Sequence, residues 1–412
     1  MTHLRASAPG RICLFGEHQD FLGLPVVAAA INLRISIEGT PRSDAVLRLD
    51  MPDIHRSDEM DLSRPIVYTK KRDYLRSCIN VLRRKGWDIS QGWDCTMTSA
   101  IPINAGVSSS SAMIVAWLKF LIEGSSARIE YSPDDLARLA HEAEVLEFGE
   151  PGGMMDHFAA ALGKVIYVDC RPPFKAEYLP LELYGFVLGD SLEKKQTLGV
   201  LGGSKGDVLE GIRMLGESYP GFDLHKTPAA EVLPLVDRLP ERIARKVRAN
   251  LVNRDLTVQA MEMFKTGIVH ERLGDLLTRH HEQLRDGIGV STPKIDRMLD
   301  AALEAGALGG KINGSGGGGC MFAYAPGIED AVAEALESAG GKAYRVRVDS
   351  GATARRPRSG TARLLSPPSL RAPTPPIQPS WSPPGSWRAT PWRAACAWRR
   401  SSRPAWPRAR AW

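Results

Sequence analysis

The stretch APGRICLFGEHQDFLGLPVVAAAI, residues 8–31, places charged side chains at both ends of one short apolar run. The run Ile12–Phe15 predicts a buried strand. Arg11 precedes it, and a polar cluster follows where a turn is expected: Glu17, His18 and Asp20. This density of charge beside a buried strand indicates a binding or catalytic role.

The bulk composition is that of a folded protein. The chain has 412 residues, enough for one large or two ordinary domains, and 43% of them are hydrophobic. Its six cysteines are scattered without a C-x-x-C pair, which predicts free thiols rather than a disulfide framework or a zinc site. No apolar stretch has the length of a signal peptide core or a membrane span, so we expect a cytoplasmic protein without a membrane partner.

The charge is distributed unevenly along the chain. Residues 351–412 contain twelve arginines and no acidic residue, so residues 1–350 carry a net charge of −6 although the whole chain carries +6. An acidic body predicts no nucleic-acid partner. The tail also contains 12 of the 29 prolines and six of the nine tryptophans, and its lack of periodicity predicts a disordered or polyproline-like segment. It is either an arginine-rich tether or unselected sequence, such as a shifted reading frame, and its exposed tryptophans favour the second.

Strand and helix patterns alternate through the body. In residues 73–87 apolar side chains recur at helical spacing, at Leu75, Cys78, Ile79 and Leu82. A Ser-Pro-Asp start signal at residue 132 predicts another helix. A second unit begins near residue 178. These patterns predict an α+β fold with two domains, residues 1–175 and 176–350, a boundary between residues 170 and 185, and a tail over residues 351–412.

Two glycine- and serine-rich stretches are candidate anion sites. In IPINAGVSSSSAMIVAW, residues 101–117, a strand, a polar loop and a helix N-terminus follow one another, an arrangement that directs backbone N–H groups at a phosphate. It lacks the G-K-[ST] of a Walker A loop, and a serine-rich helix cap explains it equally well. In GGKINGSGGGGC, residues 309–320, each glycine costs about 1 kcal/mol in an element interior, which favours close approach to a ligand over a linker.

A third stretch, EAEVLEFGEPGGMMDHFAAALG, covers residues 142–163. Asp156 stands at the predicted start of a helix, where its carboxylate either caps the helix or acts as a general base. Glu144 is a second carboxylate that can face the same space.

The order and spacing of these motifs resemble the GHMP small-molecule kinases, and most closely the galactokinases. The stretch PGRICLFGEHQDFLG resembles the galactokinase N-terminal signature, and AEVLEFGEPGGMMD resembles the galactokinase A-E-H-x(6)-C-G-x-M-D pattern. The loops NAGVSSSSA and GGKINGSGGGGC are similar to the family's phosphate loop and third glycine motif. The resemblance spans residues 6–349.

The resemblance implies a fold, a chemistry and a set of site residues. Its N-terminal half would be like ribosomal protein S5 and its C-terminal half ferredoxin-like, with the site between them. Asp156 would accept the proton of the attacking hydroxyl, and Arg11 would stabilise developing charge or orient the base. Sugar hydroxyls would be bound by Glu17, His18 and Asp20, and Mg²⁺ by Ser110 and Glu144. ATP would be bound by Asn104, Ala105, Gly106, Val107, Ser108, Ser109, Ser110, Gly314, Ser315, Gly316 and Gly317.

The expected activity is ATP-dependent phosphorylation of the anomeric hydroxyl of a monosaccharide by a monomer or homodimer. Cys13 and Phe21 replace an asparagine and a tyrosine of the galactokinase signature, and Asn104 replaces a glycine. No segment matches the galactokinase substrate tyrosine, so the sugar is left open. A mevalonate kinase-like activity is one alternative, although Glu17 and Asp20 would repel a carboxylate. A non-catalytic sensor of ATP and sugar is the other, although Arg11, Asp156 and the metal ligands are all present.

Overall fold

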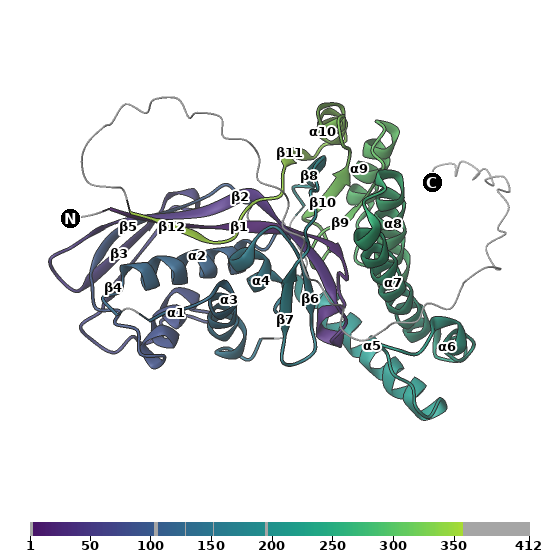
Figure 1. Ribbon diagram of the computed structural model, residues 1–412, viewed down its shortest axis with the longest axis horizontal. Helices are drawn as coiled ribbons and strands as arrows, with labels where there is room; N and C mark the ends of the chain where they lie inside the picture. Colours follow the sequence, from purple (N-terminus) through teal and green to yellow (C-terminus); the bar gives the residue numbers. More distant parts are fainter. Residues whose placement is uncertain (1–2, 103–105, 128, 151, 194–196, 357–412) are drawn as a thin grey trace, which may run out of the picture. The chain divides into compact units, whose positions relative to one another are not determined.

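The computed structural model describes residues 3–102, 106–127, 129–150, 152–193 and 197–356 (Figure 1). Its larger layer is an eight-stranded sheet in the order β12-β1-β2-β5-β3-β4, with β6 paired to β2 and β7 paired to β6. The strands are β1 (Leu4–Phe15), β2 (Val26–Pro41), β3 (Val46–Met51), β4 (Arg56–Asp61), β5 (Trp93–Ser99), β6 (Val165–Asp169), β7 (Lys175–Tyr178) and β12 (Thr353–Arg355).

Strand β1 is the central element for the site. Its last eight residues are buried without alternation, as expected of a strand covered on both faces. Helices α2 (Ser109–Gly124) and α4 (Met155–Leu162) contact it, as do α7 (Glu241–Thr266) and α8 (His270–Glu282) from the C-terminal half. The predicted strand Ile12–Phe15 is confirmed as the end of β1, so the residues that follow it emerge where elements of both halves meet.

Four helices belong to the N-terminal half (Figure 1): α1 (Tyr74–Arg84), α2 (Ser109–Gly124), α3 (Pro133–His141) and α4 (Met155–Leu162). Helices α2 and α4 contact strands of the large sheet, and α1 and α3 pack against α2. The predicted stripe on α1 is confirmed, since all four of its apolar residues are buried. The predicted start of α3 is also confirmed. Ser132 forms a capping box with Asp135, which satisfies two backbone N–H groups at the helix start.

The C-terminal half contains a four-stranded antiparallel sheet in the order β11-β8-β10-β9. With its intervening helices it follows the β-α-β-β-α-β order of ferredoxin-like folds, which confirms that expectation. Its elements are β8 (Phe186–Asp190), α5 (Thr197–Ser218), α6 (Ala229–Val236), α7 (Glu241–Thr266), α8 (His270–Glu282), α9 (Pro293–Glu304), β9 (Gly309–Ile312), β10 (Cys320–Tyr324), α10 (Glu329–Ser338) and β11 (Lys342–Val346).

The expected tail boundary at residue 351 needs a correction. Strand β12, Thr353–Arg355, pairs antiparallel with β1 and adds an edge to the large sheet. Arg34 holds this return segment by donating to the carbonyl oxygens of Ser350 and Gly351. The change in composition therefore begins before the last strand ends. Residues 357–412, which hold the rest of the predicted tail, lie outside the described residues, and the division between residues 175 and 176 stays a prediction.

The cysteine and membrane expectations can be compared with the described residues. Five of the six cysteines lie in this part of the chain, and each is buried and outside any disulfide, as predicted. None of the helices described is both long and apolar enough to cross a membrane.

Candidate active site

The turn after β1 carries the predicted substrate cluster. Gly16 and Gly23 both adopt left-handed backbone conformations, with φ of 85° and 73°, and a short 3-10 helix, Asp20–Leu22, lies between them. A Cβ on Gly16 would overlap the carbonyl of Pro25, so only glycine allows the chain to reverse here. The turn brings His18 and Asp20 together with Glu17 beside the end of β1.

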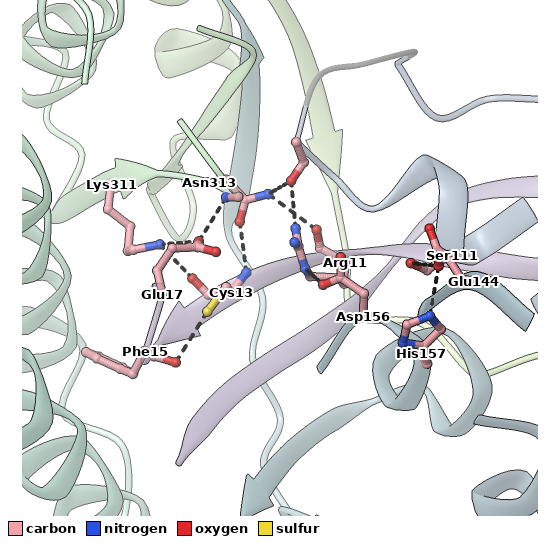
Figure 2. Close-up of polar contacts among 12 residues, drawn as sticks. Arg11, Cys13, Phe15, Glu17, Ser111, Glu144, Asp156, His157, Lys311 and Asn313 are labelled. Carbon is pink, nitrogen blue, oxygen red and sulfur yellow. Dashed lines mark hydrogen bonds and ion pairs between the residues drawn. The ribbon is translucent and has the colours of Figure 1, made fainter. Parts of the chain in front are cut away.

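Arg11 and Asp156 form the centre of the site (Figure 2). The Nε of Arg11 donates to Oδ1 of Asp156 across 2.7 Å, and its Nη1 donates to the carbonyl oxygen of Gly106 across 2.6 Å. The Arg11 side chain is 5% exposed, whereas that of Asp156 is 30% exposed. Burial opposes the charge of Arg11, but Asp156 and Glu17 raise its pKa above the ordinary value. The site thus presents an accessible carboxylate held by a buried, charged guanidinium.

Asp156 lies in the first turn of α4, as predicted, and the following residue faces another carboxylate. The Nε2 of His157 lies 2.8 Å from Oε2 of Glu144, which also accepts a 2.7 Å hydrogen bond from the Ser111 hydroxyl (Figure 2). Burial disfavours the ionised form of Glu144, but the contact with His157 and the serine hydroxyls lower its pKa below the ordinary value. Glu144 is therefore an ionised carboxylate of fixed orientation.

Two neighbouring serines in the first turn of α2, Ser110 and Ser111, lie beside Glu144. Ser110, proposed to bind Mg²⁺, is exposed on the first turn of α2, whereas Ser111 is buried and orients Glu144. The described residues contain no cluster of three or more His, Cys, Asp and Glu side chains arranged around a metal. The oxygen donors of Ser110 and Glu144 fit Mg²⁺, which usually takes one or two protein ligands besides phosphate and water.

The predicted phosphate loop continues into the N-terminus of α2. Ser108, the residue before this helix, has a left-handed φ of 62°, and its buried hydroxyl has no hydrogen-bond partner among the described residues. Val107 is fully buried, and its carbonyl accepts the backbone N–H of Arg11. Ser109 opens the helix. Asn104 and Ala105 lie outside the described residues.

The third glycine motif lies against this loop. Gly314 has φ of 78°, and a Cβ added there would overlap the Gly106 carbonyl. Gly316 and Gly317 are also left-handed, and the backbone N–H of Gly317 donates to the carbonyl oxygen of Val290 across 2.8 Å. The Ser315 hydroxyl is buried without a partner among the described residues. Two predicted ATP-binding segments, 208 residues apart at Gly106 and Gly314, are thus brought into contact.

The three predicted substrate residues have different surroundings. His18 is half-buried, and its backbone is left-handed, with φ of 61°. Glu17 is 3% exposed, and its Oε2 accepts hydrogen bonds from the ammonium of Lys311 and the backbone N–H of Gly314. Asp20 is half-buried, and its Oδ1 accepts the amide of Phe21. Burial and the nearby Asp156 raise the pKa of Asp20 to about 6.

Sequence reasoning missed two side chains of the third motif. Asn313 is buried and accepts the amide of Cys13 at 2.8 Å, while its Nδ2 donates to the Gly106 carbonyl at 2.9 Å. Lys311 is fully buried beside it. The signal for these two side chains is present in GGKINGSGGGGC, where a lysine and an asparagine interrupt a glycine run. The glycines predict a backbone close to a ligand, but they do not indicate what the lysine and the asparagine contact.

His280 and His281, two neighbouring histidines of α8, are both buried. The ring of His280 stacks on Phe15 at the end of β1, with centroids 5.9 Å apart. Burial lowers the pKa of His280 well below its ordinary value. This histidine is therefore a neutral ring packed beneath the turn.

Known families match both halves of the chain. GHMP kinases N terminal domain matches residues 73–164, GHMP kinases C terminal matches residues 265–343, and the galactokinase galactose-binding signature matches residues 2–41. These matches agree with the resemblance drawn from the motifs.

Similar proteins carry two different names. The mevalonate kinase of Pyrococcus furiosus is 32% identical over 82% of this chain and 93% of its own length. The galactokinase of Thermococcus kodakarensis is 30% identical over 78% of this chain and 89% of its own. The crystal structure of Lactococcus lactis galactokinase complexed with galactose superposes with a TM-score of 0.73 at 23% identity, covering 85% of this chain and 95% of that one.

Proposed function

This chain belongs to the GHMP kinases, enzymes that phosphorylate alcohol groups, and we propose that its acceptor is the anomeric hydroxyl of a monosaccharide. The observation that carries the proposal is the Arg11–Asp156 pair, which lies between the phosphate loop and the turn that holds Asp20.

The chemistry follows from the contacts of these two residues. Phosphoryl transfer requires an oriented hydroxyl and donors around the transferred group, with little covalent work by the protein. Asp156 accepts the proton of the acceptor hydroxyl as its oxygen bonds to the γ-phosphorus and the bond to the leaving ADP oxygen breaks. Arg11 holds Asp156 in place and contributes positive charge beside the reacting groups. Because Arg11 also bonds Gly106, the base and the phosphate loop have one fixed separation.

ATP is the proposed phosphoryl donor, and Mg²⁺ the proposed metal. Glu144, oriented by Ser111 and His157, would hold the metal together with Ser110. Mg²⁺ supplies neutralisation of the phosphate charge during transfer. The buried hydroxyls of Ser108 and Ser315 flank the contact between Gly106 and Gly314, which suits two further donors to phosphate oxygens.

A neutral sugar suits the charges around the acceptor better than mevalonate does. Glu17 is neutralised by Lys311 and Asp156 is paired with Arg11, which leaves the half-buried Asp20 as an additional carboxylate. Directed hydrogen bonds from hydroxyl groups to a carboxylate select a sugar, whereas a carboxylate substrate would be repelled. The match of residues 2–41 to the galactose-binding signature supports the same acceptor class. The identity to mevalonate kinases favours mevalonate as the second candidate.

The test is ADP release by the full chain with Mg²⁺ and ATP, across free hexoses, pentoses, uronic acids and mevalonate. Turnover of one sugar, lost in Asp156→Asn, supports the proposal. Turnover of mevalonate alone overturns the acceptor assignment and leaves the kinase assignment intact. ADP binding without turnover of any acceptor would favour a sensor.

A further inference from the structure

Lys311 is a fully buried lysine beneath the active site (Figure 2). Its Nζ lies 2.9 Å from the carbonyl oxygen of Cys13, 2.8 Å from that of Ile312 and 3.0 Å from Oε2 of Glu17. The side chain is 0% exposed. An ammonium group has three N–H donors, and three acceptors surround this one. Lys311 therefore has no donor left for a phosphate or an acceptor hydroxyl, which excludes direct contact with the reacting groups.

Glu17 extends the contact into the glycine-rich loop. The same Oε2 atom accepts the backbone N–H of Gly314 at 2.9 Å. Burial opposes ionisation of Glu17, but Lys311 and Arg11 lower its pKa to about 2. The carboxylate is thus a charged acceptor shared between a lysine of β9 and the amide that begins the loop.

Asn313 makes a parallel connection one residue before that amide. It bonds the Cys13 amide through Oδ1 and the Gly106 carbonyl through Nδ2. The end of β1, the phosphate loop and the third glycine motif are consequently joined through buried side chains of residues 311–314.

We propose that Lys311 is a positioning residue that joins the acceptor turn, residues 16–24, to the glycine-rich loop, residues 313–319, and thereby couples acceptor binding to nucleotide binding. It acts through Glu17, whose backbone belongs to the turn and whose carboxylate accepts the backbone N–H of Gly314. The inference rests on the proposed function for the role of the turn, but the coupling itself concerns two segments of this chain. Nucleotide binding to the loop should order the turn before any acceptor is present.

The experiment is hydrogen–deuterium exchange of the full chain, with and without MgADP, followed by peptide mass. The turn offers hydrogen-bonded amides at Gln19, Leu22, Gly23 and Leu24 as reporters. In the wild type, MgADP should slow exchange in both segments, by about 5-fold or more in the turn. In Lys311→Met, which removes the ammonium and keeps an unbranched chain, protection should be confined to the loop.

Glu17→Gln provides a second variant, because it keeps Lys311 with its two carbonyl acceptors and removes the charge that binds Gly314. It should lose protection of the turn in the same way, even where Lys311→Met folds poorly. Arg76→Met is the matched control, since Arg76 is a buried cation paired with Asp58 and Asp73 away from the site. It should lower thermal stability and leave the MgADP response of the turn unchanged.

Two results would overturn the inference. One is a wild-type turn whose exchange does not respond to MgADP, and the other is a turn that responds equally in Glu17→Gln. Neither of these two exchange results depends on which acceptor is phosphorylated. Failure of the sugar assignment and failure of this coupling are therefore separate outcomes. Where turnover is measurable, both variants should raise the KM for the acceptor more than they lower kcat.

Discussion

The guanidinium of Arg11 lies 2.7 Å from the carboxylate of Asp156, measured from Nε to Oδ1, although 145 residues separate them. Arg11 comes from within β1, beside a register shift between Pro9 and Arg11, and Asp156 comes from the first turn of α4. Because a second nitrogen of Arg11 bonds Gly106, one side chain sets the geometry of the base relative to the phosphate loop. This relationship leads to the first prediction.

Asp156→Asn should remove turnover while retaining nucleotide binding. An amide keeps the shape and can still accept from Arg11, but it cannot take the proton of the acceptor hydroxyl. We expect kcat to fall by about 10²–10⁴-fold, with the dissociation constant for MgADP within a few-fold of wild type by calorimetry. Asp169→Asn, at the last residue of β6, where the carboxylate pairs with Arg171, is the control and should keep full activity. Equal loss of turnover and ADP binding in Asp156→Asn would point to a structural role.

The second prediction concerns Asp20 and pH. Burial and Asp156 raise its pKa from 3.8 to about 6, so the folded protein binds this proton more tightly than the unfolded chain. Asp20 therefore contributes stability at low pH that is lost as the pH rises from about 4 to about 6. Binding of the acceptor substrate should instead strengthen as the pH rises, because the ionised carboxylate accepts hydrogen bonds from sugar hydroxyls better than the protonated form does.

The measurements are the thermal midpoint and the KM for the acceptor between pH 5 and 8. Below about pH 6 we expect KM to rise by about tenfold per pH unit. Asp20→Asn should weaken acceptor binding and flatten both pH trends. Glu17 does not interfere in this range, since its pKa lies at about 2. A KM that follows the same pH curve in Asp20→Asn would assign the titration to another group.

The third prediction separates two neighbouring serines. Ser111 orients Glu144 from a buried position, so Ser111→Ala should raise the half-saturating Mg²⁺ concentration by about tenfold or more, as loss of a supporting hydrogen bond does at metal sites. Ser110→Ala should raise it as well, but without loss of thermal stability, because that side chain is exposed. The control is Ser218→Ala, on an exposed part of α5. An unchanged Mg²⁺ requirement in both site variants would exclude this pair as the metal site.

Local patterns predicted most of the elements but few of the contacts between them. The stripe on α1 and the start signal at Ser132 depend on neighbouring residues, and both predictions are confirmed. The pairing of β12 with β1 joins residues about 350 positions apart, and a change in composition at residue 351 concealed it. Strand pairing over such distances depends on tertiary contacts that a local pattern does not contain.

The candidate site shows the same difference between local motifs, which were predictable, and contacts between distant segments, which were not. Arg11, Asp156 and the two loops were identified as motifs, and the structure brings these segments together. The partner of Glu17 was not predicted, because Lys311 stands 294 residues away in a motif interpreted for its glycines. A charged residue beside a turn has the same sequence signature whether it binds a ligand or a buried lysine.

The fourth prediction tests the contact between the two loops. Gly314 adopts φ of 78°, and a Cβ there would overlap the Gly106 carbonyl, which already accepts from Arg11 and Asn313. Gly314→Ala should therefore displace the phosphate loop and weaken MgADP binding by at least about tenfold, beyond the cost of backbone strain. Gly327→Ala isolates that strain, because Gly327 has φ of 85° but nothing within 4 Å of the added Cβ. We expect both variants to lose thermal stability and only Gly314→Ala to lose nucleotide affinity by calorimetry. Equal affinities in the two variants would mean that close approach of the loops is not required for nucleotide binding, since the left-handed backbone would then account for the whole effect.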